Sequence, residues 1–192
     1  MAFRRGFKTE ANSLALEVRS ELRLGALDRL DPFILAEHLA IPVIALSDLA
    51  TTSRAAGHLL NVDPGAFSAV TVFRGSMRTI LHNDGHSDGR ISSNITHEAE
   101  HGLLQHRPTP ALDDRGCRLW DQDVEDEAQF LSGALLVPED AALAIARGRF
   151  TKPAAAAHFG VSEKMIQYRL NVTGAVGRVE RARRAGTGYK LH

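Results

Sequence analysis

The chain has 192 residues, 44% of them hydrophobic and 24% charged, a composition typical of globular proteins that excludes a disordered or collagen-like chain. Lys and Arg number 23, as do Asp and Glu, and this zero formal net charge argues against a protein built mainly to neutralise nucleic-acid phosphates. The balance hides local polarity, because residues 113–127 are rich in acids and residues 178–192 in arginines. Nine histidines are the unusual count, and they are where chemistry should be sought.

The single cysteine, Cys117, excludes an internal disulfide and fits a reducing compartment, most simply the cytoplasm. No run approaches the ~18 apolar residues of a membrane span. The N-terminal segment is basic but lacks the apolar centre of a signal peptide. We therefore expect a cytoplasmic protein with no membrane partner.

The first half of the chain predicts two helices followed by short strands. Apolar residues recur at helical spacing over residues 9–24, which Gly25 would end, and Asp31-Pro32 would open a second helix over residues 33–39. Short apolar runs then predict strands over residues 41–46, 59–62, 69–73 and 77–81, the last two joined as a hairpin, and a loop over residues 83–90.

Helical patterns dominate the second half. Asn94 would cap a helix that ends near residue 105, and a second helix over residues 121–136 would stop at Pro138. Its acid-rich first turn suits the positive end of a helix dipole. Three shorter helices follow, over residues 139–147, 153–159 and 162–171.

The most informative motif is His97-Glu98-Ala99-Glu100-His101, within a predicted helix. Histidines at positions i and i+4 lie on one helix face, so both imidazoles can bind one zinc ion. Glu98 would then act as general base toward the water that the metal activates.

A catalytic zinc site needs a third protein ligand and an open position. His106 lies on the same helix, about 140° round from His101, and is poorly placed. The helix that begins near residue 121 offers Glu125 and Glu127, and position alone does not choose between them.

This pattern resembles the ImmA/IrrE-type metallo-endopeptidases, small bacterial zincin-like proteases of the HExxH type. The resemblance rests on the following elements: Arg5-Gly6-Phe7-Lys8, Asp31-Pro32, Ile41-Pro42-Val43, Arg90, the pentapeptide 97–101, Glu125-Asp126-Glu127-Ala128 and Ala134-Leu135-Leu136-Val137-Pro138. In this family the metal-binding glutamate lies thirteen residues before the proline of the last element, so the resemblance selects Glu125. Glu127 would then orient a ligand or a histidine N–H, from which its carboxylate would accept a hydrogen bond.

The resemblance implies a fold of the α+β class, a zincin-like core in which a small antiparallel or mixed sheet packs on helices. Residues 1–147 would form the metallopeptidase domain and residues 148–192 a C-terminal helical extension with a helix-turn-helix-like element, packed on the core. Many members have Leu-Gly where this chain has Ala99-Glu100, and we expect Glu100 to add a negative charge close to the site.

The implied function is zinc-dependent cleavage of a helix-turn-helix repressor or a similar regulatory protein. The rival hypothesis is a catalytically idle zincin-like regulator that binds DNA, suggested by Gly160-Val161-Ser162 and by the arginine-rich tail. Its recognition helix would offer the following residues to a groove: Lys164, Gln167, Tyr168, Arg169 and Asn171. The structural alternative is a helical hairpin that buries Phe159, Val161, Ile166 and Leu170 against the core, with the tail as a solvated face. A third possibility is a peptidase that forms half of a toxin–antitoxin-like pair.

Four further residues have a structural and a functional interpretation. His82 and His86 could help to polarise a scissile carbonyl, but the simpler expectation is an ordinary strand-end and an ordinary loop residue. For Cys117 and Trp120 we expect packing in the core rather than a role at the metal or the substrate.

Overall fold

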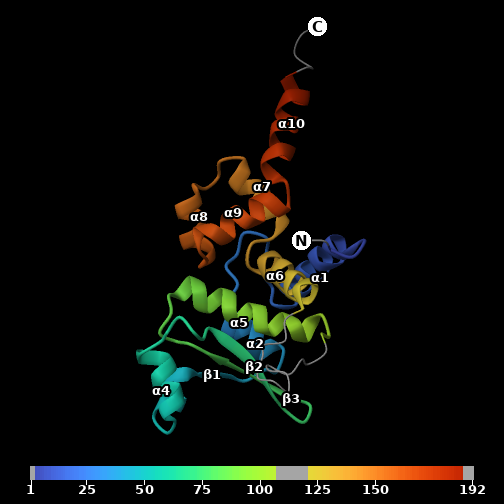
Figure 1. Ribbon diagram of the computed structural model, residues 1–192. Helices are drawn as coiled ribbons and strands as arrows, with labels where there is room; N and C mark the ends of the chain where they lie inside the picture. The colour runs from blue at the N-terminus through green and yellow to red at the C-terminus, as the bar shows by residue number, and fades with distance from the viewer. Residues whose placement is uncertain (1–2, 107–120, 188–192) are drawn as a thin grey trace.

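The structure, a computed structural model, describes residues 3–106 and 121–187. Within these residues the chain forms ten helices and one three-stranded sheet (Figure 1). In chain order the elements are α1 (Phe7–Glu21), α2 (Pro32–His38), β1 (Val43–Ala45), α3 (Leu46–Ala50), α4 (Arg54–Asn61), β2 (Ala69–Arg74), β3 (Met77–His82), α5 (Asp88–Leu103), α6 (Gln122–Leu136), α7 (Glu139–Ala146), α8 (Lys152–Phe159), α9 (Glu163–Val172) and α10 (Ala175–Thr187). The predicted α+β class is confirmed. Cys117, Trp120 and Lys190 lie outside the described residues.

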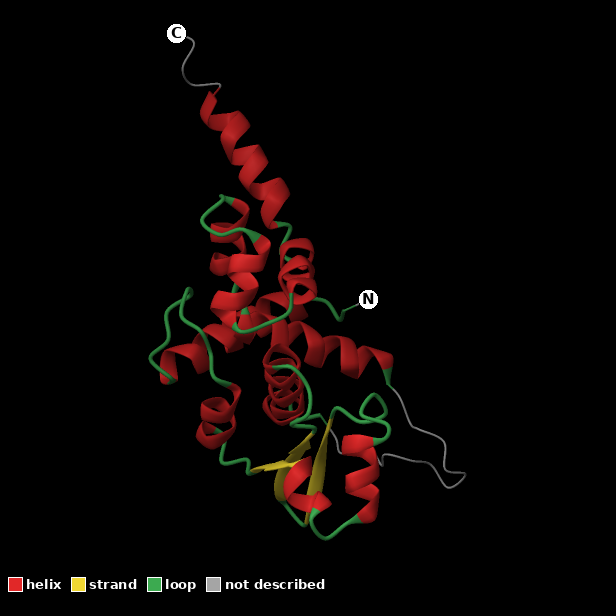
Figure 2. Ribbon diagram, turned by 90° about the vertical axis from the view of Figure 1, so that its left-hand side faces the viewer, coloured by secondary structure: helices red, strands yellow, loops and turns green. Residues whose placement is uncertain are grey.

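The sheet is small and mixed, with strand order β1-β3-β2. Strands β2 and β3 form the predicted antiparallel hairpin, and β1 pairs parallel to β3. The register aligns Val43, Ile80 and Thr71 across the three strands, so these side chains share one face. Ile80 is fully buried on that face, where α5 packs on the sheet (Figures 1 and 2). Strand β2 is at one edge of the sheet and pairs only with β3.

The core lies between α5, α6 and α1. Ile95 and Ala99 of α5 and Leu131 of α6 are fully buried and belong to one hydrophobic cluster. Helix α1 joins through an aromatic pair, Phe7 and Phe130, whose ring centroids are 5.8 Å apart in an edge-to-face arrangement. The contact fixes α6 between α1 and α5.

Two buried arginines hold the C-terminal end of α6. Arg19 Nη1 donates to the carbonyl oxygen of Leu135 at 2.7 Å, and Arg169 Nε donates to that of Val137 at 2.8 Å. Both arginines are at most 1% exposed. Because the last carbonyls of a helix have no partner within the helix, these bonds satisfy buried acceptors and fix the position of α6.

Two predicted elements are corrected. Residues 59–62 belong to helix α4, not to a strand; Ser53 caps this helix by accepting a bond from the N–H of Ala56 at 3.3 Å. A short apolar run is compatible with either structure, and the cap decided here. Helix α5 begins at Asp88, six residues before Asn94, and Gly89 in its first turn lets the backbone of Val161 approach to a distance that a Cβ would crowd.

The C-terminal helices pack on the core as the structural alternative predicted. Phe159 and Ile166 are fully buried, and Val161 and Leu170 are each 6% exposed. Gly160 ends α8 in the left-handed region, with φ of +65°, and the Ser162 hydroxyl caps α9 by accepting from the N–H of Met165.

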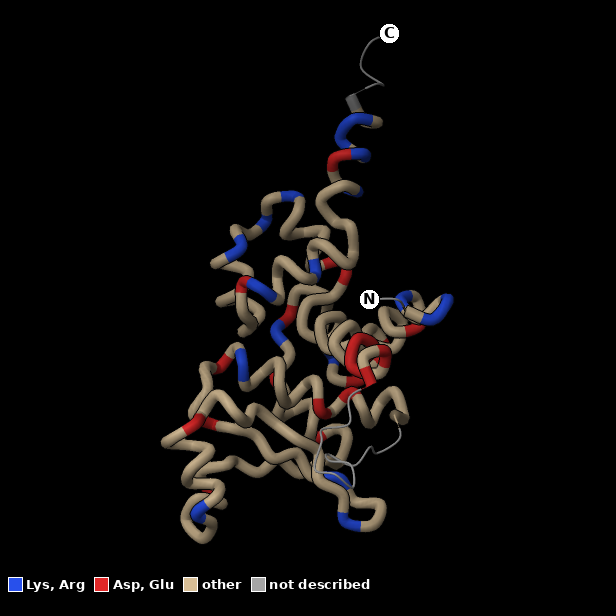
Figure 3. The backbone as a smooth tube through the Cα atoms, viewed as in Figure 1, with Lys and Arg blue, Asp and Glu red and all other residues tan. Residues whose placement is uncertain are grey.

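The arginine-rich tail continues as helix α10, which projects away from the body (Figure 1). Its buried contacts are Ala175 and Val179, near α7, and Arg178 pairs with Glu139 of α7. The charges of the tail gather along this helix, whereas acids gather at the first turn of α6 (Figure 3). The solvated face expected for the tail is therefore the outer surface of a helix.

No single helix of the described residues is long and apolar enough to cross a membrane. Helices α6 and α7 pass the same test of length and composition only as a pair, and this pair is bent by 65°.

Candidate metal centre

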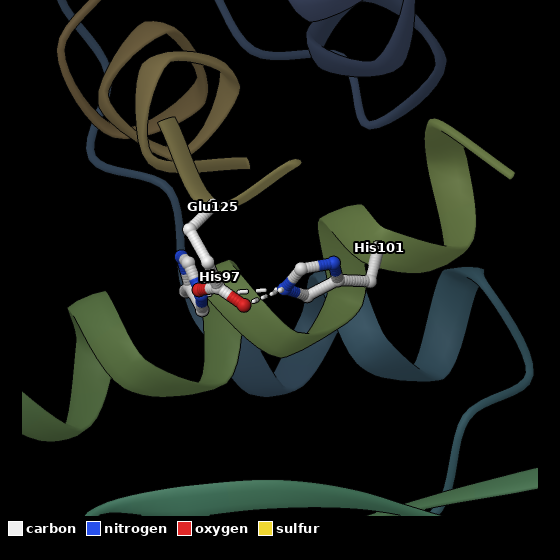
Figure 4. A group of neighbouring side chains, drawn as sticks. All are labelled: His97, His101 and Glu125. Atoms are coloured by element: carbon white, nitrogen blue, oxygen red, sulfur yellow. Dashed lines mark hydrogen bonds and ion pairs between the residues drawn. The ribbon is translucent and has the colours of Figure 1, made fainter. Parts of the chain in front are cut away.

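Helix α5 brings the two histidines of the pentapeptide together. His97 and His101 are one turn apart, and their Nε2 atoms are separated by 3.3 Å (Figure 4). Ile95 and Ala99 anchor the opposite side of the helix in the core, which turns both imidazoles toward α6. The helix thus presents two nitrogen ligands from one rigid element.

Helix α6 adds Glu125 from its first turn. Its Oε2 lies 3.1 Å from His97 Nε2, and its Oε1 lies 4.0 Å from His101 Nε2 (Figure 4). One ligand atom from each of the three residues falls within 4.8 Å of the others. Two imidazoles and one carboxylate are the donor set of a catalytic zinc site with an open position, so these residues fit the predicted metal.

The protonation of His101 suits this role. Burial lowers the pKa of His101 to about 4, the nearby His97 imidazole acts in the same direction, and the Glu125 carboxylate opposes it. His101 is therefore a neutral imidazole at pH 7, the form that binds a metal. His97, His101 and Glu125 retain side-chain exposures of 27%, 22% and 24%, which leaves the group accessible from one side.

Glu98 points to the sheet rather than to the three ligands. The Thr71 hydroxyl, from edge strand β2, donates to Glu98 Oε2 at 2.7 Å. The bond holds the carboxylate beside the histidine pair and leaves Oε1 available to a proton. Sequence reasoning did not find Thr71, which is 27 residues away; the only local indication is a polar side chain on the inner face of an otherwise apolar strand.

A second chain of contacts runs from His101 away from the ligand group. His101 Nδ1 lies 3.0 Å from His106 Nδ1, and His106 Nε2 lies 3.6 Å from Glu127 Oε2. Glu127 also pairs with Arg4 at 3.3 Å. With His101 Nε2 facing the metal position, its Nδ1–H would donate to His106 Nδ1, and the Glu127 carboxylate lies beside the other ring nitrogen of His106, beyond hydrogen-bond distance.

Glu125 and Glu127 thus point in different directions. The geometry places Glu125 with the histidine pair and Glu127 behind it, next to a histidine N–H. His106 is not among the three ligands. The sequence did not predict its contact with His101, because residues five positions apart do not stack on one helix face.

The structure places Glu100 on a different face of α5 from the histidine pair. Its side chain is fully buried, on the face of α5 that packs toward α6 and α9. Burial raises the pKa of Glu100 well above its ordinary value, against the opposing effects of the Ser132 backbone and the Arg169 guanidinium. Burial therefore favours the neutral form of Glu100, which opposes the negative charge expected near the metal ligands.

His82 and His86 do not join the ligand group. His82 is 4% exposed at the end of β3 and packs edge-to-face on Phe33, with ring centroids 5.7 Å apart. His86 Nε2 lies 2.9 Å from the carbonyl oxygen of Pro64. Both contacts are structural, as the simpler interpretation expected.

Arg169, one of the residues that the proposed recognition helix would offer to DNA, is not accessible. Arg169 is fully buried beneath α9, where its guanidinium lies 5.2 Å from the centroid of the Phe130 ring and its Nε holds Val137. It therefore cannot reach a DNA groove without unfolding the contact between α9 and α6.

Comparison with known families adds a finding that the geometry alone does not supply. The sequence model of the peptidase family M78, described as the IrrE N-terminal-like domain, matches residues 36–171, more than two thirds of the chain. The chain belongs to this family. M78 is a metallopeptidase family, in agreement with the resemblance seen in the sequence, and the matched region contains the histidine pair, Glu125 and α9. Comparisons with curated proteins and with solved structures return no match.

Proposed function

We propose that this M78-family protein is a zinc-dependent endopeptidase. The observation that carries the proposal is the convergence of His97, His101 and Glu125, within 4.8 Å of one another, beside a glutamate held by a hydrogen bond. A zinc ion bound there would polarise a peptide carbonyl and lower the pKa of a water molecule toward neutrality.

The residues of the chain would perform the proton transfers. Glu98 Oε1, the oxygen that Thr71 does not engage, would accept the proton of the attacking water and then pass it to the leaving amine nitrogen. Thr71 would hold the carboxylate in place through both transfers.

Substrate binding would use the edge of the sheet. Strand β2 lies at the edge and carries Thr71, so an extended peptide that paired with β2 would pass beside Glu98. We expect the natural substrate to be a helix-turn-helix transcriptional repressor or a similar regulatory protein, as the family resemblance implies.

The rival DNA-binding function has less support from the geometry. Arg169, the arginine of its recognition helix, is buried in the core, although the arginines of α10 remain on a helix surface. A salt-dependent DNA shift lost on mutation of Lys164 and the α10 arginine Arg181 would favour that function, and no binding at low salt would exclude it.

Two measurements test the peptidase proposal. Elemental analysis should find about one zinc per chain in the wild-type protein and none in His97→Ala. Co-expression with the repressor encoded beside the gene should deplete intact repressor with wild type and spare it with Glu98→Gln. Equal zinc content in wild type and His97→Ala, or equal depletion of intact repressor by wild type and Glu98→Gln, contradicts the proposal.

A further inference from the structure

A cavity of about 460 Å³ lies under the C-terminal half of α5. Its walls come from three segments: Ala99, Gly102 and Leu103 of α5, residues 39–42 before β1, and residues 76–78 at the start of β3. The volume falls in the range of about 300–1,000 Å³ that is typical of ligand sites. Most of the wall is aliphatic, so the cavity suits an apolar body.

Arg78 is the one charged side chain among the residues that line this cavity. Its guanidinium rests against Gly102, in the space that a Cβ would occupy, and lies 5.5 Å from the centroid of the Phe73 ring. In residues 3–106 and 121–187 no carboxylate pairs with it. A half-buried guanidinium without an anionic partner is a site for an anion, since its five donors match a carboxylate in two-pronged geometry.

The cavity lies under α5, on the side of the helix away from His97 and His101. Arg78 lines this cavity, and its guanidinium contacts Gly102, the residue after His101. Arg78 is close enough to His101 for its charge to act on that imidazole. A group held by Arg78 is therefore within reach of a peptide whose scissile bond lies at His97 and His101.

We infer that this cavity is a substrate subsite that selects a carboxylate, with Arg78 as the specificity-determining residue. The substrate residue would place its aliphatic stem against Ile41, Met77 and Leu103 and its carboxylate on the guanidinium of Arg78. The carboxylate can come from a Glu or Asp side chain or from the C-terminus of a peptide. The inference rests on the proposed peptidase function and adds a substrate class to it.

The test begins with a peptide library, offered with free and with amidated C-termini to the zinc-loaded protein. Once cleavage positions are known, matched peptides with Glu or Gln at the position that the library prefers are compared by kcat/KM. We expect wild type to favour the Glu peptide by about 10–100-fold, the discrimination that a charge-assisted hydrogen bond supplies. A preference for free over amidated C-termini assigns the carboxylate to the peptide terminus. A preference for Glu over Gln that persists in amidated peptides assigns it to the side chain.

Three variants identify the residue responsible. Arg78→Gln should reduce the preference to about one, and Arg78→Glu should favour a Lys peptide. Gly102→Ala keeps the charge but displaces the guanidinium, so it should also lower the preference. Arg74→Gln, on the same hairpin and exposed, is the matched control and should leave the preference unchanged. Circular dichroism and zinc content establish that each variant is folded and metal-loaded.

Failure of the subsite and failure of the peptidase proposal give different results. Efficient cleavage with equal kcat/KM for Glu and Gln peptides and for free and amidated C-termini, or an unchanged preference in Arg78→Gln, overturns the subsite and leaves the peptidase intact. If no peptide is cleaved, binding to zinc-loaded Glu98→Gln is measured by fluorescence anisotropy. If the Glu peptide binds more tightly than the Gln peptide and Arg78→Gln abolishes this difference, the subsite is supported and the peptidase proposal is contradicted. If no such difference is found, both proposals are overturned.

Discussion

Helices α5 and α6 meet along two faces that have opposite environments. On one face, His97, His101 and Glu125 keep about a quarter of their side-chain surface exposed, with values of 27%, 22% and 24%. On the other face, toward α9, Glu100 and Arg169 are fully buried. Glu100 directly precedes His101, so a candidate metal ligand and a buried core carboxyl are neighbours in the sequence.

The comparison shows that the helix face, not the proximity in sequence, sets what an ionisable side chain does here. On the open face water and substrate can enter, and two imidazoles and one carboxylate lie close enough together to bind one metal ion. On the closed face, burial favours the neutral form of a carboxyl, and Arg169 forms a structural bond to Val137. Four predictions test this division.

The largest effect is expected from substitution of Glu125, compared with the same substitution of Glu127. Glu125→Ala removes one of three ligands, so the protein should lose stoichiometric zinc and its peptidase activity. Glu127→Ala should retain zinc at saturating concentration, because Glu127 contacts His106 and not the ligand group. Elemental analysis after dialysis against zinc measures both; a zinc-free Glu127→Ala together with a zinc-loaded Glu125→Ala would reverse the assignment.

The second prediction concerns the metal-free protein in acid. His101 has an ordinary pKa of 6.5 and a folded pKa of about 4, so the unfolded state binds more protons between these values. The free energy of unfolding should therefore fall by up to about 3 kcal/mol as the pH drops from about 6.5 to about 4. Denaturant titrations in the presence of a chelator measure this loss.

His101→Gln should flatten this acid limb, and His58→Gln, at an exposed position of α4, serves as the control that should not. An unchanged limb in His101→Gln would place the responsible group elsewhere.

The third prediction concerns the chain from His101 through His106 to Glu127. His106→Gln and Glu127→Gln should each weaken zinc binding by about 10–100-fold, because they remove the support of a ligand imidazole. Competition with a chromophoric chelator gives the dissociation constants, independent of activity. The double variant should bind zinc almost as tightly as the single variant that has the lower zinc affinity, because the two residues act through one contact chain.

Glu10→Gln is a matched control, because Glu10 also pairs with Arg4 but does not contact His106. If Glu10→Gln weakens zinc binding as much as Glu127→Gln does, the N-terminal ion pairs and not His106 carry the effect.

The fourth prediction concerns the closed face. Because burial raises the folded pKa of Glu100, the folded state binds more protons than the unfolded state above pH ~4.3, and stability falls as the pH rises through this window. The slope is about 1.4 kcal/mol per pH unit. Glu100→Gln keeps the shape of the protonated carboxyl and should remove the slope, as measured by thermal or denaturant unfolding at several pH values. An unchanged slope would show that Glu100 is ionised in the folded protein.

Much of the candidate site could be predicted from the sequence because its signals are local. The i, i+4 histidine pair needs only a helix, and helix caps such as Asp31 and Asp121 are readable within three residues. The pattern narrowed the third ligand to Glu125 or Glu127, and the family resemblance selected Glu125. Whether these residues bind zinc stays a prediction.

The remaining features depend on contacts between distant segments. Thr71 meets Glu98 across 27 residues, and Arg169 meets Val137 across 32. Periodicity does not encode such pairs, because they follow from how the hairpin and α9 dock on α5 and α6. The same applies to residues 59–62, whose apolar run suited a strand until the Ser53 cap made them part of a helix.

The sequence by itself therefore determined the family, the α+β class and the residues from which a metal site could be built. The tertiary structure decided whether Glu125 or Glu127 faces the histidine pair, which carboxyl of the pentapeptide is buried, and which arginines are structural. The physical reason is that covalent spacing fixes the position of a side chain on its own helix, whereas the solvent exposure and the partners of that side chain depend on what packs against the helix.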